Sequence, residues 1–491
     1  MKCQSGSSDA QARSRCLASL LLVALSTAVL TGCFEDETRS QDAAVTQLDP
    51  ATGERVDRTH KSDRMVVAVR PEHVRPPAKA SDSASRNTPN SEPLSKFFRG
   101  LNALKTGHRS APVTILHLGD SHIAADRFAG SLRALFQERF GDAGRGMMMP
   151  GFPFPYYRAR GVDFARSGKW TAANSFKKDP GPYGVTGVRL TAREKGAQLS
   201  LTGTAGPFEW AAVAFATSPK GGKAKVSFGG DEQTLSTRAD KTRIKRVRFA
   251  VKGRELTVTT ADKAPVSILS WSAGQNRPGV RYVNLGIPGA SADTPDRWNE
   301  AMVDDDLAQL KPDLIVLGYG TNEGFQDDLD VASYEKRVAD LVNRFKAHAP
   351  QASVLILGPP DGLRFPRYAR PRNKRAAASA PCKPLSADER DRYEKLKKEK
   401  SRRLARWHAP PRLADVRAAL RRIAQETRAH FWDWSSVMGG ECGIHAWAKA
   451  DPPLAASDRV HLRGRGAKRS AQALFDELMR NYEIHVRLAS H

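Results

Sequence analysis

Five short apolar runs, separated by amphipathic or polar segments, constrain the fold of this chain most strongly. Apolar residues recur at helical spacing within Phe128–Phe140, Tyr334–Phe345 and Leu413–Ile423. Short apolar strands that alternate with amphipathic helices predict an α/β domain with a parallel sheet, and such sheets bind ligands at the carboxyl ends of their strands. The predicted strands are Val113–Leu118, Val280–Leu285, Leu314–Tyr319, Ser353–Gly358 and His430–Trp434.

The helical period is absent between about Pro155 and Trp271. Short β-rich pieces such as GAQLSLTG, KAKVSFGG and RELTVTT occur there instead, separated by glycines and polar turns. Their even spacing predicts an antiparallel β-sandwich inserted into the α/β domain. Two roles are open for four of its aromatic side chains, which either stack on sugar rings or fill the sandwich core. These residues are Trp170, Tyr183, Trp210 and Trp271.

The N-terminus has the layout of an export signal. Arg13 and Arg15 precede the apolar run CLASLLLVALSTAVL, which is too short to span a membrane comfortably. The following LTGC resembles a bacterial lipobox, which implies cleavage before Cys33 and a lipid on its sulfur. An ordinary signal peptide with an incidental cysteine is the alternative. Phe34 after the cysteine, by similarity to Gram-negative lipoproteins, implies a lipid anchor in the outer membrane that faces the periplasm.

The residues after Cys33 are polar, charged and rich in Pro, Ser and Ala, which is typical of a flexible tether. The predicted organisation therefore has five parts. They are a signal peptide at 1–32, the tether at 33–94, a first part of the α/β domain at 95–150, the β-sandwich at 151–279, and a second part of the α/β domain at 280–491.

Charge and cysteine content agree with an exported protein. The formal net charge of +25 favours an acidic partner, such as nucleic acid, an anionic membrane or an anionic envelope polymer. Export argues against nucleic acid. Three of the five cysteines precede or form the lipidation site, which leaves Cys382 and Cys442. In an oxidising compartment a disulfide between them is possible, and two separately buried thiols are the alternative.

Two charged segments separate the fourth and fifth predicted strands. The basic, proline-interrupted residues 362–384 predict a solvated loop, and a cationic guide for an anionic polymer is the alternative. The following charged run, residues 387–407, predicts a surface helix.

The first predicted strand ends in Gly119-Asp120-Ser121-His122, which fits two kinds of site. Asp120 and His122 have the Asp-x-His spacing that opens a metallophosphoesterase site, whereas Ser121 has the place of a nucleophile between a strand and a helix. A two-metal site needs further carboxylate, Asn and His ligands. The sequence has no Gly-Asp-x-x-Asp after Ser121 and no histidine in the GYGTNEG segment. We therefore favour the serine.

A serine nucleophile needs a base, a carboxylate that orients the base, and donors for the oxyanion. Asp458 and His461 lie in a turn before the last helical segment, at a spacing that lets the carboxylate hold one imidazole nitrogen. Gly289 follows one predicted strand, where its N–H can approach a substrate oxygen, and Asn322 follows the next. Four such elements in this order are difficult to attribute to chance.

With these four blocks the sequence resembles the SGNH or GDSL hydrolases. The blocks are Gly119-Asp120-Ser121, Gly289, Gly320-Thr321-Asn322-Glu323 and Asp458-Arg459-Val460-His461. The resemblance implies a flavodoxin-like three-layer fold and a serine esterase without metal or cofactor. It also implies Ser121 as nucleophile, His461 as base and Asp458 as its orienting carboxylate, with an oxyanion hole formed by the N–H groups of Ser121 and Gly289 and the Asn322 amide. Asp120, Gly320 and Glu323 have supporting places, and His122 is interpreted as a wall of the site.

The sequence resembles the peptidoglycan O-acetylesterases, whose insert is similar to a carbohydrate-binding module. The resemblance lies in the YGTNE motif, the inserted β-module and the segment FWDWSSVMGGECGIHAW. The resemblance implies an exported esterase that removes O-acetyl groups from peptidoglycan or another envelope polysaccharide. An O-acetyltransferase of the same fold and a non-catalytic glycan-binding lipoprotein are the alternatives.

Overall fold

A computed structural model describes residues 93–155 and 157–490 of the chain. The predicted signal peptide, Cys33 and nearly all of the predicted tether lie outside the described residues. Within those two ranges, every helix is either too short or too polar to span a membrane.

Sheet A contains five parallel strands in the order β13-β1-β14-β15-β16. Every residue of β1 and β15 is buried, as expected for parallel strands that are covered on both faces. The strands are β1 (Val113–Gly119), β13 (Val280–Gly286), β14 (Leu314–Gly318), β15 (Ser353–Gly358) and β16 (His430–Asp433).

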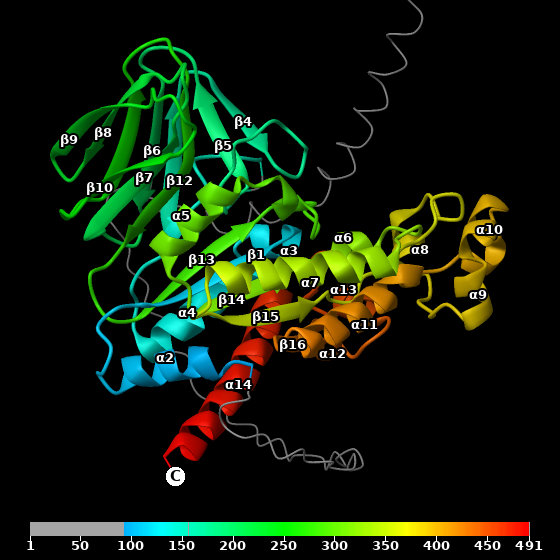
Figure 1. Cartoon of the computed structure of the whole chain (residues 1–491). Coiled ribbons are helices and arrows are strands. Elements are labelled where there is room, and N and C mark those ends of the chain that lie inside the picture. Colours follow the sequence, from blue (N-terminus) through cyan, green and yellow to red (C-terminus); the bar gives the residue numbers. More distant parts are fainter. Residues whose placement is uncertain (1–92, 156, 491) are drawn as a thin grey trace, which may run out of the picture. The chain divides into compact units, whose positions relative to one another are not determined.

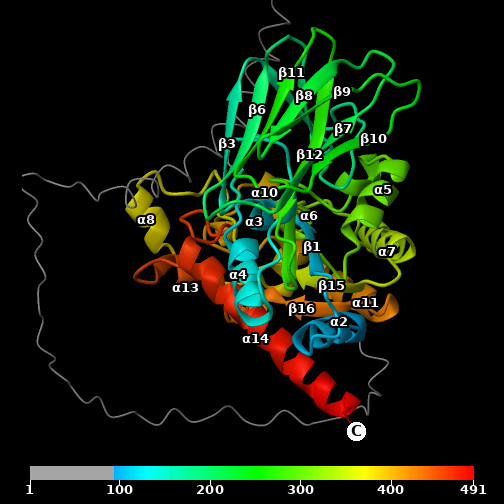
Figure 2. The ribbon, with the colours of Figure 1, turned by 90° about the vertical axis from the view of Figure 1, so that its left-hand side faces the viewer.

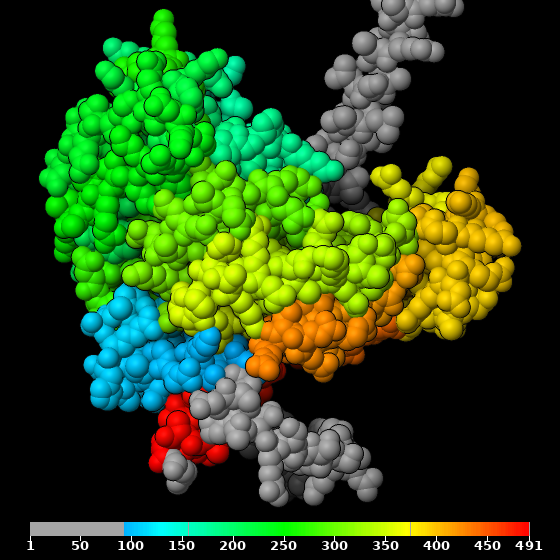
Figure 3. Space-filling view, viewed as in Figure 1, coloured from blue at the N-terminus to red at the C-terminus, as the bar shows by residue number. Residues whose placement is uncertain are grey.

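Helices cover both faces of sheet A. Alternate residues of each strand point to opposite sides of the sheet, and the apolar residues on both sides are buried under helices. Val113 and Ile115 of β1 pack with α2 (Ser95–Lys105), α4 (Phe128–Phe140) and α14 (Gly464–Ala489). Figure 2 shows α4 and α14 in front of this face. The opposite face packs against three other helices. Two of them, α7 and α11, are visible on the face of the molecule shown in Figure 3. The three helices are α5 (Glu300–Leu310), α7 (Val331–His348) and α11 (Pro411–Glu426). This arrangement confirms the predicted three-layer α/β fold.

The segment between β2 (Gly146–Met148) and β13 forms two antiparallel sheets, which confirms the predicted sandwich (Figure 1). Sheet B has the order β10-β7-β12-β5-β4, with β2 paired to β12, and sheet C has the order β3-β6-β11-β8-β9. The strands are β3 (Val162–Ser167), β4 (Trp170–Asn174), β5 (Val188–Ala192), β6 (Gln198–Gly203), β7 (Trp210–Ala216), β8 (Lys223–Phe228), β9 (Asp231–Ser236), β10 (Ile244–Phe249), β11 (Glu255–Thr260) and β12 (Val266–Gly274).

The four aromatic residues singled out in the sandwich are all buried: Trp170, Tyr183, Trp210 and Trp271 are at most 8% exposed. Burial to this extent rules out a flat sugar-stacking platform at the surface. Trp170, Tyr183 and Trp271 pack in the sandwich core, whereas the Trp210 ring is covered by two arginine side chains. The sandwich is also joined to the α/β domain by polar contacts. The Val185 N–H donates to Asp306 of α5 at 3.0 Å, and the Trp298 indole donates to Ser175 at 3.1 Å.

The charged run 387–407 does not form one continuous helix, in contrast to the prediction. It forms α9 (Ala387–Asp391), α10 (Tyr393–Lys398) and a 3-10 turn at Arg402–Leu404. The chain bends because Tyr393, Leu396 and Leu404 turn inward with Leu385 into a small apolar cluster. Tertiary burial here outweighs the helical propensity of the charged residues.

Candidate active site

Glycines at the strand ends allow a short helix to cross sheet A. β1, β13 and β14 each end in Leu-Gly, and in the sheet register Gly119 pairs with Gly286 of β13 and with the last glycine of β14. A Cβ on Gly286 would lie 2.4 Å from the Ala124 nitrogen, and one on Gly119 would lie 2.6 Å from the Ile123 side chain. Only glycines let α3 (Ser121–Ala124) lie this close to the strands. The sheet therefore holds Ser121 at its carboxyl edge.

The structure brings Ser121, His461 and Asp458 together across 340 residues of sequence. The Ser121 Oγ lies 3.0 Å from Nε2 of His461, and the Nδ1 of the same ring lies 2.7 Å from Asp458 Oδ2. The other carboxylate oxygen of Asp458 accepts the N–H groups of Val460 and His461. Burial opposes ionisation of Asp458, but these hydrogen bonds and the nearby imidazole outweigh it and lower its pKa to about 2.

An ionised Asp458 fixes the tautomer of His461. The carboxylate only accepts hydrogen bonds, so Nδ1 of His461 carries the ring proton and donates a hydrogen bond to Asp458. Nε2 then carries no proton and can accept the one from the Ser121 hydroxyl. This arrangement can remove a proton from the serine as its oxygen attacks a carbonyl carbon.

His122 packs directly against the base and does not point to Ser121. Its ring stacks on that of His461, with centroids 5.6 Å apart. Its Nδ1 lies 3.2 Å from Asp120 Oδ1, and its Nε2 lies 3.0 Å from the Val460 carbonyl oxygen. Burial disfavours the charged ring, but the facing Asp120 carboxylate outweighs burial and raises the pKa of His122. When protonated, the ring donates to both acceptors and holds Val460, which lies within the Asp458–His461 turn.

Three donors lie at the same edge of the sheet, after β1, β13 and β14. The N–H groups of Ser121 and Gly289 donate to no acceptor among the described residues. Gly289 has a φ of +82°, a left-handed conformation that favours glycine. The Asn322 amide donates one hydrogen to the Ala290 carbonyl at 2.8 Å, which leaves its second hydrogen for a ligand. These groups have the chemistry of an oxyanion hole.

Glu323 connects two loops by hydrogen bonds. We call them the oxyanion loops, because one carries Gly289 and the other carries Asn322. One carboxylate oxygen accepts the Ala292 N–H at 2.7 Å, and the other accepts the Gly320 N–H at 3.0 Å. The first loop follows β13 and the second follows β14. Burial raises the pKa of Glu323 to about 7, and the two backbone donors partly offset that rise.

Arg459, whose role the sequence did not indicate, anchors the turn that carries the base. It is 3% exposed, and its φ of +56° is left-handed. Its guanidinium lies 4.3 Å from the Trp407 ring centroid and donates to the Ala378 carbonyl at 3.0 Å. A disulfide between Cys382 and Cys442 closes the 60-residue span that contains Trp407. The segment after β15 thus supports the Asp458–His461 turn.

The sandwich reaches the oxyanion loop through Phe176. A Cβ on Gly289 would lie 2.7 Å from the Phe176 ring, so this ring packs on the glycine. Phe176 is nevertheless 37% exposed, which makes it one of the few exposed large apolar side chains among the described residues. A phenylalanine in a loop of the insert carries no sequence signal that would place it here.

The sequence matches the model of the GDSL-like Lipase/Acylhydrolase family over residues 261–469. The matched range contains Gly289, Asn322, Asp458 and His461, whereas Ser121 precedes it. Comparison with curated proteins gave no significant match.

Among solved structures, the chain is similar to a peptidoglycan O-acetylesterase, with 25% identity and a TM-score of 0.63. The similarity covers 81% of this chain and 97% of the other, so it includes the insert as well as the α/β domain. An acetylxylan esterase from Geobacillus stearothermophilus matches with 20% identity, 41% and 73% coverage and a TM-score of 0.25. A family two carbohydrate esterase from Cellvibrio japonicus matches with 11% identity, 64% and 98% coverage and a TM-score of 0.25.

Only the first of these structural similarities is close enough to support an argument. It spans the same combination of a parallel α/β domain and an inserted sandwich as the structure described above. Together with the family match, it shows that residues 261–469 form part of a GDSL-like, or SGNH, hydrolase domain and that the chain is a serine esterase.

Proposed function

We propose that this protein is an exported, lipid-anchored esterase that removes O-acetyl groups from peptidoglycan or another envelope polysaccharide. The observation that carries the proposal is the connected set of Ser121, His461 and Asp458 beside two oxyanion loops. Similarity to a peptidoglycan O-acetylesterase over nearly the whole of that chain supports the substrate class. Export and the anchor at Cys33 rest on the N-terminal sequence.

In the proposed reaction, the Ser121 hydroxyl gives its proton to Nε2 of His461 while its oxygen attacks the acetyl carbonyl carbon. The carbonyl oxygen becomes an oxyanion, which accepts hydrogen bonds from the N–H groups of Ser121 and Gly289 and from the Asn322 amide. His461 then returns the proton to the sugar oxygen as the ester bond breaks, and the acetyl group stays on Ser121. Water, deprotonated by His461, releases acetate and restores the serine.

The test is acetate release from O-acetylated peptidoglycan by the full-length protein, compared with acetylated xylan and small acetyl esters. Faster release from peptidoglycan supports the proposed substrate. Equal rates on all glycans would reject peptidoglycan as the preferred substrate. Ser121→Ala is the control, and a fluorophosphonate probe that labels the wild type and not this variant would establish the nucleophile.

An O-acetyltransferase would form the same acetylated serine and pass the acetyl group to a sugar hydroxyl instead of water. The two activities separate when a non-acetylated glycan acceptor is added to the assay. Turnover that rises with acceptor and yields acetylated glycan would contradict the esterase proposal. Unchanged turnover with acetate as the product agrees with it.

A further inference from the structure

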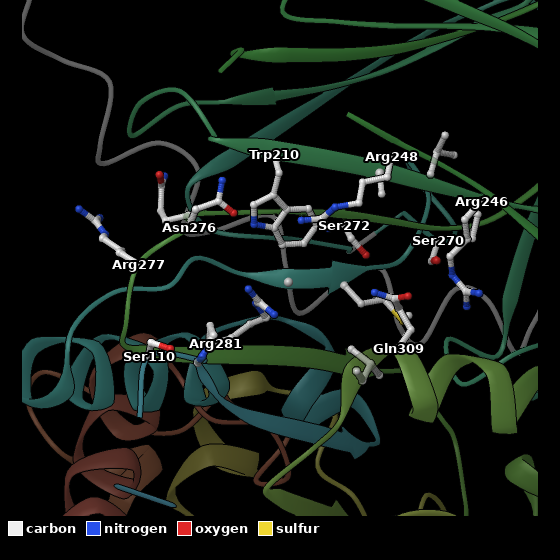
Figure 4. A pocket seen from close by; sticks show the side chains of 18 residues that line it. Ser110, Trp210, Arg246, Arg248, Ser270, Ser272, Asn276, Arg277, Arg281 and Gln309 are labelled. Carbon is white, nitrogen blue, oxygen red and sulfur yellow. The ribbon is translucent and has the colours of Figure 1, made fainter. Parts of the chain in front are cut away.

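A polar pocket lies where the sandwich meets the amino end of sheet A. Its volume is about 340 Å³, at the lower end of the range for small-molecule sites. Trp210 and Arg248 contribute from the sandwich strands β7 and β10, whereas Ser110, Arg281 and Gln309 contribute from the α/β domain (Figure 4). Arg281 is the second residue of β13, and Ser110 precedes β1. Because Ser121 follows the far end of the seven-residue strand β1, the pocket lies about 20 Å from the nucleophile.

Two arginines in this pocket, Arg248 and Arg281, have no acceptor for their side chains among the described residues. The guanidinium carbons of Arg248 and Arg281 lie 4.2 and 5.1 Å from the Trp210 ring centroid. Neither side chain makes a hydrogen bond or ion pair with any described residue, and the Nε of Arg281 is buried without an acceptor. Burial lowers the pKa of both groups, and for Arg281 the nearby Arg248 lowers it further. The indole therefore lies against two uncompensated cations.

The rest of the lining does not neutralise this charge. No Asp or Glu lines the pocket within the described residues. Arg246, also in the lining, is already paired with Asp305 and Asp306. Arg277, also in the lining, donates from its Nε to the Asp142 carbonyl at 2.7 Å. Hydroxyl and amide side chains complete the polar lining, and these groups suit the hydroxyls of a sugar. They are Ser110, Ser270, Ser272, Gln275, Asn276 and Gln309.

We propose that this pocket binds an anionic sugar unit, with its carboxylate or phosphate held between Arg248 and Arg281 and its hydroxyls on the surrounding polar side chains. Paired guanidinium groups match the geometry and charge of both anions. A bound anion would supply the acceptors that the two arginines lack. The site goes beyond the proposed esterase activity, because it would hold an acidic glycan away from the reacting serine and does not depend on ester cleavage.

The test is isothermal titration calorimetry of the full-length protein with D-glucuronate, D-glucose 6-phosphate and uncharged D-glucose. We expect at least one of the two anionic sugars to bind and glucose not to bind, and the one that binds more tightly identifies the anion. Arg248→Gln and Arg281→Gln should each weaken binding at least tenfold. Arg254→Gln is the matched control, because Arg254 is an exposed sandwich arginine outside the pocket.

Three outcomes would overturn the proposal. The first is no binding at concentrations that detect millimolar dissociation constants. The second is equal binding by Arg248→Gln, Arg254→Gln and the wild type, which would indicate general attraction to a basic surface. The third is binding of glucose as tightly as the anionic sugar that binds more tightly. Hydrolysis of a small acetyl ester should be unchanged in both pocket variants, so a failure of the esterase proposal and a failure of this site are distinguishable.

Discussion

The Glu323 carboxylate accepts the Ala292 N–H at 2.7 Å and so joins the loop after β14 to the loop after β13. Both loops carry donors of the proposed oxyanion hole, Asn322 on one and Gly289 on the other. A single buried side chain thus sets the separation of two groups that contact the same substrate oxygen in the proposed reaction. Small changes in that separation matter, because catalysis depends on donor positions fixed before reaction.

Glu323→Gln should change the pH dependence of stability. Burial raises the pKa of Glu323 from 4.5 to about 7, so between these pH values the native state keeps a proton that the unfolded chain has released. The free energy of unfolding should therefore fall as pH rises through this window, by on the order of 3 kcal/mol. Glutamine cannot titrate, so urea unfolding at pH 5 and pH 8 should show a smaller loss for the variant. Equal losses would contradict the assigned pKa shift.

Asp458→Asn should abolish most of the activity without unfolding the protein. The asparagine amide can donate to Nδ1 of His461, which would place the ring proton on Nε2 and block proton transfer from Ser121. By analogy with serine proteases, kcat should fall about 10⁴-fold. Steady-state kinetics with a chromogenic acetyl ester measures this loss. Asp328→Asn is the control, because Asp328 is exposed and makes no ion pair among the described residues. A similar loss in both variants would argue against the role of Asp458.

Asn322→Ala should lower kcat about 10²–10³-fold with little change in KM, because its amide binds the oxyanion more strongly than the ground-state carbonyl. The variant also loses the hydrogen bond to the Ala290 carbonyl, so its fold should be verified by circular dichroism. A rise in KM with unchanged kcat would instead indicate a role in substrate binding.

Arg459→Ala should weaken catalysis indirectly. The change removes the contacts with Trp407 and Ala378 that hold the turn carrying Asp458 and His461. We expect kcat to fall about tenfold, because a small misplacement of catalytic groups slows the reaction. KM should stay nearly constant. Arg465→Ala, at an exposed arginine in the first turn of α14, should have no effect. Wild-type kcat in Arg459→Ala would show that the turn holds its shape without this anchor.

Loss of the disulfide should reduce stability. The Cys382–Cys442 bond closes a span of 60 residues, for which chain entropy gives about 4 kcal/mol of stabilisation. Urea unfolding of the Cys382→Ser/Cys442→Ser double variant, with and without reductant, measures this difference. Reductant should lower the free energy of unfolding of the wild type and leave that of the variant unchanged. Insensitivity of the wild type would show that the bond contributes little.

The sequence by itself determined the α/β class, the inserted sandwich and the residues that can carry serine chemistry. Each rests on a local signal: apolar runs mark buried strands, and Ser121, Gly289, Asn322 and His461 each follow a strand or a turn. The repeated Leu-Gly at the strand ends was also readable, and it could have indicated where α3 crosses the sheet.

Tertiary structure alone decided which groups meet and what surrounds them. The stacking of Arg459 on Trp407, the packing of Phe176 on Gly289 and the paired cations at Trp210 all join segments that are distant in sequence. Tertiary contacts also decided the burial of the aromatic rings in the sandwich and the bend in the run 387–407. The physical reason is that burial and pairing depend on neighbours in space, which a local pattern of residues does not encode.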